Sequence, residues 1–309
     1  MNLRINLTAW GTHVQTMRSV LFPSLLSPGN LPALAARHSI TIDLCSTPVN
    51  FDDLLSCPHF IKIAEYADVD FVEVEPNETR RVHQILSACH RHTLGQRCDG
   101  CLFIQPDMII ADGALRWLAE VIPDANAVLV ATPRAILGNA AALSFPVTPR
   151  RLMRFMLDHK HPVTDSLIVN KMQSSIHPSH LYWQAGSDGF AVRAFHMHPL
   201  FIVPRGDKIG NTIDGDYLQT YYPDGERFVY ATNSDDMAII ELSQPQHMGR
   251  TIIHEPATFD QIKKWMRGYT LPIHRQHAKQ KIRLIADFTD QSAWDECEDE
   301  AEEFTRMFL

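Results

Sequence analysis

The stretch Gly100-Cys-Leu-Phe-Ile-Gln-Pro-Asp-Met-Ile-Ile-Ala-Asp-Gly113 decides the fold, because an apolar run in it ends at an acidic residue. Residues 101–104 have the continuous apolar character of a buried strand, and Pro106 cannot donate to a sheet ladder, so it marks the end of that strand. Asp107 then falls where side chains project into the crevice at a sheet edge, the place where open α/β sheets bind ligands. The plainer alternative is that Asp107 is only a turn residue.

A helical pattern follows this strand within a few positions. Asp112 or Gly113 can cap the helix, since both residue types are common just before the first helical turn. Apolar residues then recur with a period of about 3.6 residues from Leu115 to Ile122, and Pro123 stops the pattern. The stretch is therefore one strand-to-helix step of an α/β sheet.

Strand-like and helical patterns alternate through the first half of the chain. The strand-like runs are residues 4–9, 39–45, 69–74, 101–104 and 125–132, and the helical patterns are residues 14–26, 51–66, 77–93 and 115–122. Such alternation predicts an α/β fold with a mostly parallel, twisted sheet and helices on both faces. We expect one domain over residues 1–245 and a mainly helical C-terminal extension over residues 246–309.

Elements are harder to place in the second half. The later strand candidates are residues 190–202, as one strand or a bent pair, residues 227–231 and residues 237–242. Residues 134–182 and the tail from residue 259 have mostly helical patterns. The acidic run at residues 295–303 is typical of a solvated helix face, and we assign it no chemistry.

Composition excludes several classes of protein. Of the 309 residues, 45% are hydrophobic and 21% are charged, which is typical of a soluble globular chain, and no stretch approaches the ~18 apolar residues that span a bilayer. The formal charge of −8 argues against a nucleic-acid partner. The first residues lead straight into a strand pattern without the features of a signal peptide, so we expect a cytoplasmic protein. Composition says nothing of the oligomeric state.

The six cysteines do not form the dense pattern of a disulfide scaffold, so we expect them to be reduced. Cys98 and Cys101 make a single CxxC motif, with Cys89 and His92 just upstream. A zinc site can be drawn from these four residues, but the chain has no second CxxC, and Cys101 has the character of a strand-core residue. Zinc is the less favoured interpretation.

Three groups of polar residues stand out from apolar surroundings. They are Asp107; Asp188 with His196 and His198; and Asp214 with Asp216 at the start of a short helical pattern. A divalent ion beside a diphosphate takes one or two carboxylates, sometimes an imidazole, and otherwise water and phosphate oxygens. On one strand His196 and His198 would share a face, which favours a metal site about as much as it favours two half-buried structural side chains.

The order of elements resembles the GT-A fold of nucleotide-sugar glycosyltransferases. Five strand-to-helix steps, an acidic residue after the fourth apolar strand and a later carboxylate pair that opens a helix are similar to that family over residues 1–245. The family's usual Asp-x-Asp is here Gln105-Pro106-Asp107, so only the final carboxylate matches. The missing first Asp also allows a metal-independent transferase, or a chain that keeps the fold without the activity.

The resemblance implies roles for particular residues. Asp107, beside Gln105, would hold a Mn²⁺ or Mg²⁺ ion and the diphosphate of a nucleotide-sugar donor, the co-substrate. The end of the first strand, at Thr8, Trp10 and Gly11, would contact the base or ribose. The remaining roles fall to residues of the second half: Asp214 or Asp216 as general base, Asp188 as a further catalytic candidate, and His196 or His198 as an additional metal ligand.

The sequence thus favours a hexosyltransferase-like enzyme that moves a sugar to a glycan or another hydroxyl acceptor, as in surface polysaccharide or glycoconjugate synthesis. Two alternatives stay open. One is a metal-dependent hydrolase that uses Asp188, His196, His198 and Asp214, since such clusters also activate water. The other is a non-catalytic binding protein that keeps the sheet, with the acidic tail as a partner surface.

Overall fold

The structure is a computed structural model that describes residues 1–76, 82–169, 179–210, 212–247 and 257–308. The chain divides into two compact units. Unit 1 comprises Met1–Leu129, Phe145–Val147 and Pro199–Val229, and unit 2 comprises Val130–Ser144, Thr148–His198 and Tyr230–Leu309. Residues 77–81, where the third predicted helix begins, and the predicted helical residues 170–178 lie outside the described part.

Unit 1 is built on a seven-stranded sheet in the order β11-β6-β10-β4-β1-β2-β3. The strands are β1 (Asn2–Thr8), β2 (Ser39–Ser46), β3 (Asp68–Glu73), β4 (Gly100–Ile104), β6 (Ala127–Val130), β10 (His198–Ile202) and β11 (Phe228–Ala231). β1, β2, β3 and β4 run in parallel, and β10 is antiparallel to β4. The predicted α/β fold with a mostly parallel sheet is therefore confirmed.

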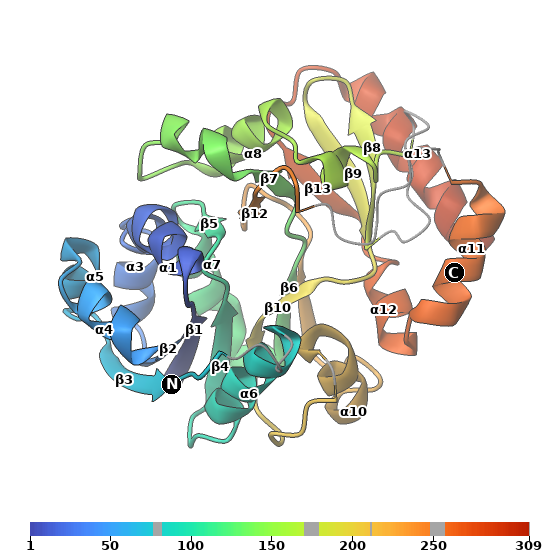
Figure 1. Cartoon of the computed structure of the whole chain (residues 1–309). Coiled ribbons are helices and arrows are strands. Elements are labelled where there is room, and N and C mark those ends of the chain that lie inside the picture. Colours follow the sequence, from blue (N-terminus) through green and yellow to red (C-terminus); the bar gives the residue numbers. More distant parts are fainter. Residues whose placement is uncertain (77–81, 170–178, 211, 248–256, 309) are drawn as a thin grey trace. The chain divides into compact units, whose positions relative to one another are not determined.

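Helices surround this sheet (Figure 1). They are α1 (Thr12–Thr16), α2 (Phe22–Leu25), α3 (Leu31–Ala35), α4 (Pro48–Leu55), α5 (Pro58–Ile63), α6 (Val82–Leu94), α7 (Ala114–Val121) and α10 (Leu218–Tyr221), with π-helical turns η1 (Met17–Leu21) and η4 (Ile213–Tyr217) and the 3₁₀ turn η2 (Ile122–Asp124). Parallel strands need right-handed crossovers, and the crossover through α6 steps in the opposite direction from those before it. α6 therefore covers the face of the sheet opposite to α1–α5, packed on β1 and β4.

The opening stretch forms the predicted strand and helix with one addition. β4 ends at Ile104, a turn follows, and a short strand β5 (Met108–Ile110) precedes α7. Gly113 is the N-cap of α7 with φ +97°, a backbone conformation that glycine adopts at no steric cost. Asp112 instead accepts a hydrogen bond from Gly29 N at 2.6 Å. Asp112, which the sequence allowed as the N-cap, therefore makes a tertiary hydrogen bond instead of capping α7.

Unit 2 contains a three-stranded antiparallel sheet. β8 (His180–Ala185) pairs with β9 (Gly189–Ala194), and β9 pairs with β13 (Ile282–Ile285). β7 (Arg134–Ile136) pairs in parallel with β12 (Ile239–Ser243). The helices of this unit are α8 (Pro149–Asp158), α9 (Pro162–Asp165), α11 (Phe259–Tyr269), α12 (Pro272–His277) and α13 (Gln291–Phe308), with a 3₁₀ turn η3 (Leu137–Ala142).

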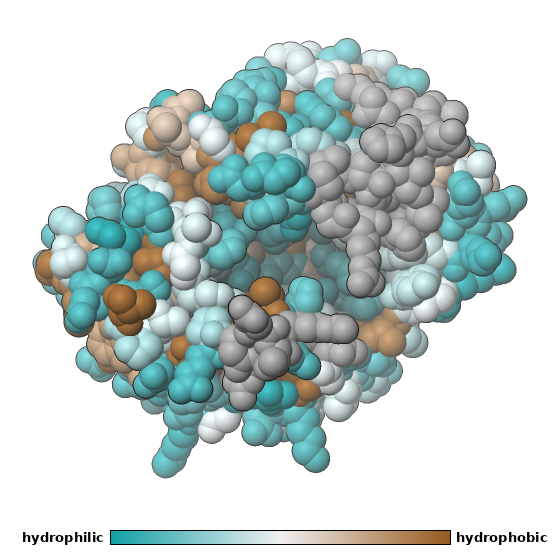
Figure 2. Space-filling view, viewed as in Figure 1, coloured by the Kyte–Doolittle hydropathy of each residue, from teal (hydrophilic) through white to brown (hydrophobic). Residues whose placement is uncertain are grey.

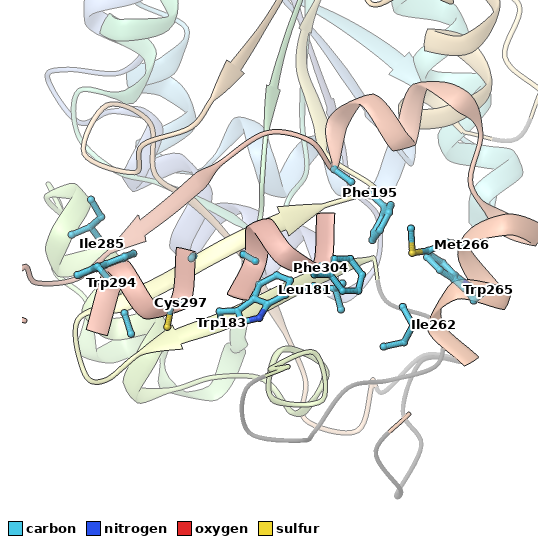
Figure 3. Packing of buried hydrophobic residues seen from close by; sticks show 14 residues of the cluster. Leu181, Trp183, Phe195, Ile262, Trp265, Met266, Ile285, Trp294, Cys297 and Phe304 are labelled. Atoms are coloured by element: carbon cyan, nitrogen blue, oxygen red, sulfur yellow. The ribbon is translucent and has the colours of Figure 1, made fainter. Parts of the chain in front are cut away.

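A buried cluster in unit 2 combines aromatic and aliphatic side chains, and five of its fourteen residues are aromatic (Figure 3). The acidic helix α13 contributes its apolar face to this core, with Trp294, Cys297 and Phe304 all at most 4% exposed. Fully burying such a side chain stabilises a fold by about 1.5–3 kcal/mol. The helical pattern expected for the tail is therefore present, but its apolar face is a core element of unit 2.

One of the two arrangements expected for residues 190–202 is present, and one strand was not expected. Residues 190–202 form a bent pair whose halves, β9 and β10, belong to different sheets, so His196 lies in the bend and only His198 is on a strand. β13 interrupts a tail that the pattern predicted to be helical. Its run Ile282–Ile285 is only four residues long, and pairing with β9 decides its conformation.

The visible face of the molecule is mostly hydrophilic, with scattered hydrophobic residues (Figure 2). Exposed apolar side chains such as Val49, Leu55 and Ile61 lie on α4 and α5. Single exposed apolar residues are normal for globular proteins. In the described ranges, the structure contains no helix with the length and apolar character needed to cross a membrane.

Candidate functional site

The strand order of unit 1 places a topological switch point between β1 and β4. From β1 the chain steps to β2 and then to β3 on one side, and it crosses afterwards to β4 on the other side of β1. At such a reversal the connections leave the two neighbouring strands in opposite directions, which opens a crevice at their carboxyl ends. Open α/β sheets bind nucleotides in this crevice.

The register of the sheet brings two predicted segments to this edge together. Leu7 is the partner of Ile104, so Thr8 and Gln105 leave β1 and β4 side by side. Asp107 follows two residues later, half-buried in the turn between β4 and β5. Asp107 therefore lies in a turn and at the sheet edge at the same time, so its position agrees with both interpretations of the sequence.

The end of β1 is held in place by local interactions. The Thr8 hydroxyl donates to Asn6 Oδ1 at 2.9 Å, and the Ser46 hydroxyl donates to Ala9 O at 2.5 Å. Trp10 is half-buried against a cluster of Cys45, Val74, Ile85 and Cys89. Gly11 then adopts φ +59°, which side-chain-bearing residues rarely do, and turns the chain into α1.

A buried polar network aligns the strands beneath this edge. Asp43 on β2 is fully buried, and both its carboxylate oxygens accept from Arg4 Nε at 3.1 Å. Arg4 also pairs with Asp70 on β3, and the Thr93 hydroxyl of α6 donates to Asp43 at 2.7 Å. A buried carboxylate is costly unless it is paired and hydrogen-bonded, and this one is both. The network therefore ties β1, β2, β3 and α6 into one register.

Asp214 and Asp216 both lie at the start of η4 in unit 1, half-buried. The Thr212 side chain caps this turn by accepting from Gly215 N at 3.3 Å. A Cβ placed on Gly210 would lie 2.9 Å from Asp216 Oδ2, so Asp216 is turned against the backbone of Gly210. Residues two apart on a helix do not face the same way, so the side chains of Asp214 and Asp216 leave the turn on different sides.

Asp188 has a structural position in unit 2. It is 2% exposed, and its carboxylate accepts from Thr289 N at 2.5 Å, Asp290 N at 2.9 Å and the Thr289 hydroxyl at 2.9 Å. Burial alone would raise the pKa of Asp188, but the hydrogen bonds from Asp290 and Thr289 outweigh it and hold that pKa below its usual range. The carboxylate thus anchors the segment that leads into α13, and its predicted catalytic role stays a prediction.

His196 and His198 have different surroundings within unit 2. The His196 ring lies 4.2 Å from that of His274 and 6.1 Å from that of Trp265, between ring centroids. His198 instead lies near Glu241, whose pKa is held low against the effect of burial, chiefly by Arg134, with His198 contributing. The shared face expected for the two histidines is therefore not formed, because the bend between β9 and β10 separates them.

Pattern analysis missed the imidazoles of α12. His274 and His277 are three residues apart just after Pro272, a helical spacing that could have signalled a shared face. His274 Nδ1 accepts from Leu271 N at 3.1 Å, which in the neutral ring places the proton on Nε2. His277 Nδ1 lies 3.2 Å from the Tyr230 hydroxyl.

No family model matches the chain, and no curated protein matches it. Among solved structures, its neighbours are glycosyltransferases. TarS 1–349 of S. aureus in complex with UDP has a TM-score of 0.44 and 11% identity, covering 100% of this chain and 71% of that one. Its UDP-GlcNAc complex has a TM-score of 0.42 and 10% identity, covering 100% and 72%.

Other matches to these proteins are partial. For the glycosyltransferase GlyE of Streptococcus pneumoniae TIGR4 the TM-score is 0.27 and the identity 13%, covering 41% of this chain. The chain spans 36% of TarS 1–349 in a further match, 22% of TarS and 29% of GlyE.

Proposed function

We propose that the chain is a glycosyltransferase that transfers a sugar from a nucleotide-diphosphate donor to a hydroxyl acceptor. The observation that carries the proposal is the switch point of unit 1, where Thr8 and Gln105 leave adjacent parallel strands and Asp107 follows at the same edge. This supports a nucleotide donor, because open α/β sheets bind nucleotides where the connections of adjacent strands diverge.

Each segment at this edge has a role in donor binding. Trp10 offers an aromatic surface to the base or ribose, with Thr8 and Gly11 beside it. Gln105 and Asp107 come from the adjacent strand end and would contact the diphosphate. The rigid network under the strands supports this role, because binding groups on rigid elements lose little conformational entropy when a ligand binds.

Asp107 also fits a divalent cation. Mg²⁺ and similar hard ions are commonly held by one or two carboxylates together with phosphate oxygens and water, and Asp107 supplies one carboxylate at the edge where the diphosphate would lie. When bound, such an ion offsets the negative charge that develops on the leaving diphosphate. His196 and His198 as further metal ligands remain a prediction of the sequence.

For the general base we favour Asp214 over Asp216. A base must reach the proton of the acceptor hydroxyl, and the Asp216 carboxylate is turned against the Gly210 backbone. Asp188 is the weakest candidate, because its oxygens already accept hydrogen bonds from Thr289 and Asp290. That use of Asp188 also weakens the hydrolase alternative, which relied on the same carboxylate.

The test is donor binding by thermal shift, with a panel of nucleotide sugars that includes UDP-N-acetylglucosamine, with and without Mn²⁺. A donor at about 100 times its dissociation constant should stabilise the protein by ~2.7 kcal/mol. Asp107→Asn should remove most of the Mn²⁺-dependent part of this shift. Asp99→Asn is the matched control, since Asp99 lies just before β4 at the other end of the sheet, where it accepts from Asn2 N at 2.7 Å.

Three outcomes discriminate the functions. Release of the nucleotide only when a hydroxyl acceptor is added supports transfer. Equal release without an acceptor would instead indicate a hydrolase. Absence of stabilisation by every nucleotide sugar, with and without Mn²⁺, would contradict the donor site and leave a non-catalytic binding protein.

A further inference from the structure

A pair of thiols lies at the amino end of β4, away from the proposed donor site. Cys98 precedes the strand by two residues and Cys101 is its second residue, and their Sγ atoms are 3.4 Å apart. The strand between the pair and the turn at Asp107 is five residues long, or about 16 Å at 3.3 Å per residue. This CxxC motif has no part in the function proposed above.

The two thiols differ in access. Cys98 is half-buried, whereas Cys101 is 0% exposed and lies within 3.7 Å of Thr93 O. Gly100 between them is required by close packing, because a Cβ at that position would lie 2.2 Å from the ring of Phe201. Asp99 is held to β1 through Asn2, since Asp99 N donates to Asn2 O at 2.8 Å and the Asp99 carboxylate accepts from Asn2 N. The loop that carries Cys98 is therefore fixed on both sides of the motif.

We propose that Cys98 and Cys101 form a reactive dithiol site that exchanges with a low-molecular-weight disulfide. The Cys98 thiolate attacks one sulfur of the disulfide, forms a mixed disulfide and releases one thiol. Cys101 then loses its proton and attacks the Cys98 sulfur, which closes the Cys98–Cys101 bond and releases the second thiol. Two protein thiols are oxidised and one disulfide is reduced to two thiols, so electrons and protons balance.

The electrostatics support this order of attack. A hydrogen bond from Cys101 lowers the pKa of Cys98, with smaller contributions from the Gly100 backbone and the Arg4 guanidinium, and these together outweigh burial and Asp43, which raise it. The same hydrogen bond, together with burial, raises the pKa of Cys101. The accessible sulfur is thus the better nucleophile, as in other CxxC motifs. Closing the bond requires the sulfurs to approach by about 1.3 Å, which a small rotation of the Cys98 side chain can supply.

Zinc is a weaker interpretation of the same residues. A structural zinc ion takes four ligands, usually cysteine and histidine. Among the described residues, no third metal-binding side chain gathers with Cys98 and Cys101. The upstream Cys89 is buried in the cluster with Cys45 and hydrogen-bonds to it.

The experiment equilibrates the full chain with mixtures of oxidised and reduced glutathione, blocks free thiols with an alkylating reagent and digests with trypsin. Cleavage after Arg97 and Arg116 yields one peptide with these two cysteines and no other. With rising oxidised glutathione this peptide should lose two hydrogen atoms in mass and escape alkylation. The buried pair Cys45 and Cys89 is the internal comparison and should stay reduced.

Single substitutions separate the two steps. Cys101→Ser should stop at a mixed disulfide on Cys98 and slow the alkylation of Cys98 at neutral pH, because losing the hydrogen bond from the Cys101 thiol raises the pKa of Cys98. Cys98→Ser should leave Cys101 unreactive. Persistent reduction of the wild-type peptide at every ratio would overturn the proposal, and so would a stoichiometric metal ion on the pair. Donor binding at the opposite end of β4 is a separate readout, so neither result decides the proposed function.

Discussion

Carboxylates serve different purposes in the two units. In unit 1, Asp107 lies in a turn just past a parallel strand, at the switch point of the sheet. In unit 2, Asp188 is buried and accepts three hydrogen bonds that anchor the segment before α13. Both residues follow an apolar or small-residue segment in the sequence, and both are acidic groups in a turn. The hydrogen bonds of Asp188 identify it as a structural group, whereas the case for Asp107 rests on its place at the sheet edge.

This difference teaches that burial and hydrogen-bond geometry, not residue type, assign the role of an acidic side chain. Unit 2 uses its charged groups to hold elements together, for example Glu241, which accepts from Thr132 and pairs with Arg134 at 2.9 Å. Unit 1 does the same with Asp43 beneath the sheet, but at the sheet edge it places polar residues in the crevice. Substitutions should therefore affect turnover in unit 1 and stability in unit 2.

The largest expected effect is that of Asp214→Asn on turnover. Loss of a general base lowers the rate by about 10²–10⁴, while donor affinity should change little because the group acts on the acceptor's proton. Asp216→Asn is the matched control and should lower turnover by less than about fivefold, far below the range for a lost base. The measurement is kcat with saturating donor alongside the donor dissociation constant. A harmless Asp214→Asn with a damaging Asp216→Asn would move the base by two residues.

Asp188→Ala should mainly destabilise the protein. Removing a buried carboxylate leaves the N–H groups of Thr289 and Asp290 without their acceptor, at a cost of about 2–4 kcal/mol. Chemical unfolding measures this loss, and residual activity per folded molecule should stay near that of the wild type. If turnover fell while stability did not, Asp188 would belong to the catalytic groups after all.

The pH dependence of the same residue has a defined sign. The hydrogen bonds hold the folded-state pKa of Asp188 below its usual range, so the stability it contributes is present above the unfolded pKa of about 3.9. That contribution is lost as the pH falls through the lower, folded-state pKa. The difference in free energy of unfolding between the wild type and Asp188→Ala should accordingly become smaller below about pH 4.

His180 should make the stability of the protein depend on pH in a separate, less acidic range. It is 7% exposed and stacked on Tyr182, and burial lowers its pKa to about 4. The unfolded chain binds a proton below about pH 6.5, whereas the folded chain does not until about pH 4, so stability falls as the pH drops between these values. His180→Phe should remove this pH dependence, which lowers the free energy of unfolding of the wild type by roughly 2 kcal/mol between pH 6.5 and pH 5. An unchanged slope in thermal unfolding between pH 4 and 6.5 would show that His180 is not the group responsible.

The smallest expected effect is that of Glu298→Gln. Glu298 pairs with Arg283 across α13 and β13, and the two side chains are 30% and 37% exposed. Exposed ion pairs contribute about 0–1 kcal/mol and weaken with salt. The variant should therefore unfold within 1 kcal/mol of the wild type, with the difference shrinking at high salt. A salt-independent loss of several kcal/mol would place this pair among the structural carboxylates typified by Asp188.

The sequence predicts the strongly patterned elements well. The strand at β4, the helix α7 before Pro123 and the later strands β11 and β12 lie close to the predicted positions, because each has a continuous or periodic apolar pattern in the sequence. Two short strands were missed, because β5 has only three residues and β13 lies within a stretch whose overall pattern is helical. The antiparallel β10 between β4 and β6 could not be foreseen, because its neighbours are about 70 to 100 residues away along the chain.

Local order in the sequence thus determined that strands and helices alternate, that the first strands form a parallel sheet and that Asp107 follows one of them. Tertiary structure decided what each polar residue does. It bound Asp188 to the segment that precedes α13, separated His196 from His198 by a bend between two sheets, and turned Asp216 toward Gly210. The physical reason is that apolar periodicity can be read from neighbouring residues. The burial and hydrogen-bond partners of a side chain depend instead on residues that are distant along the chain.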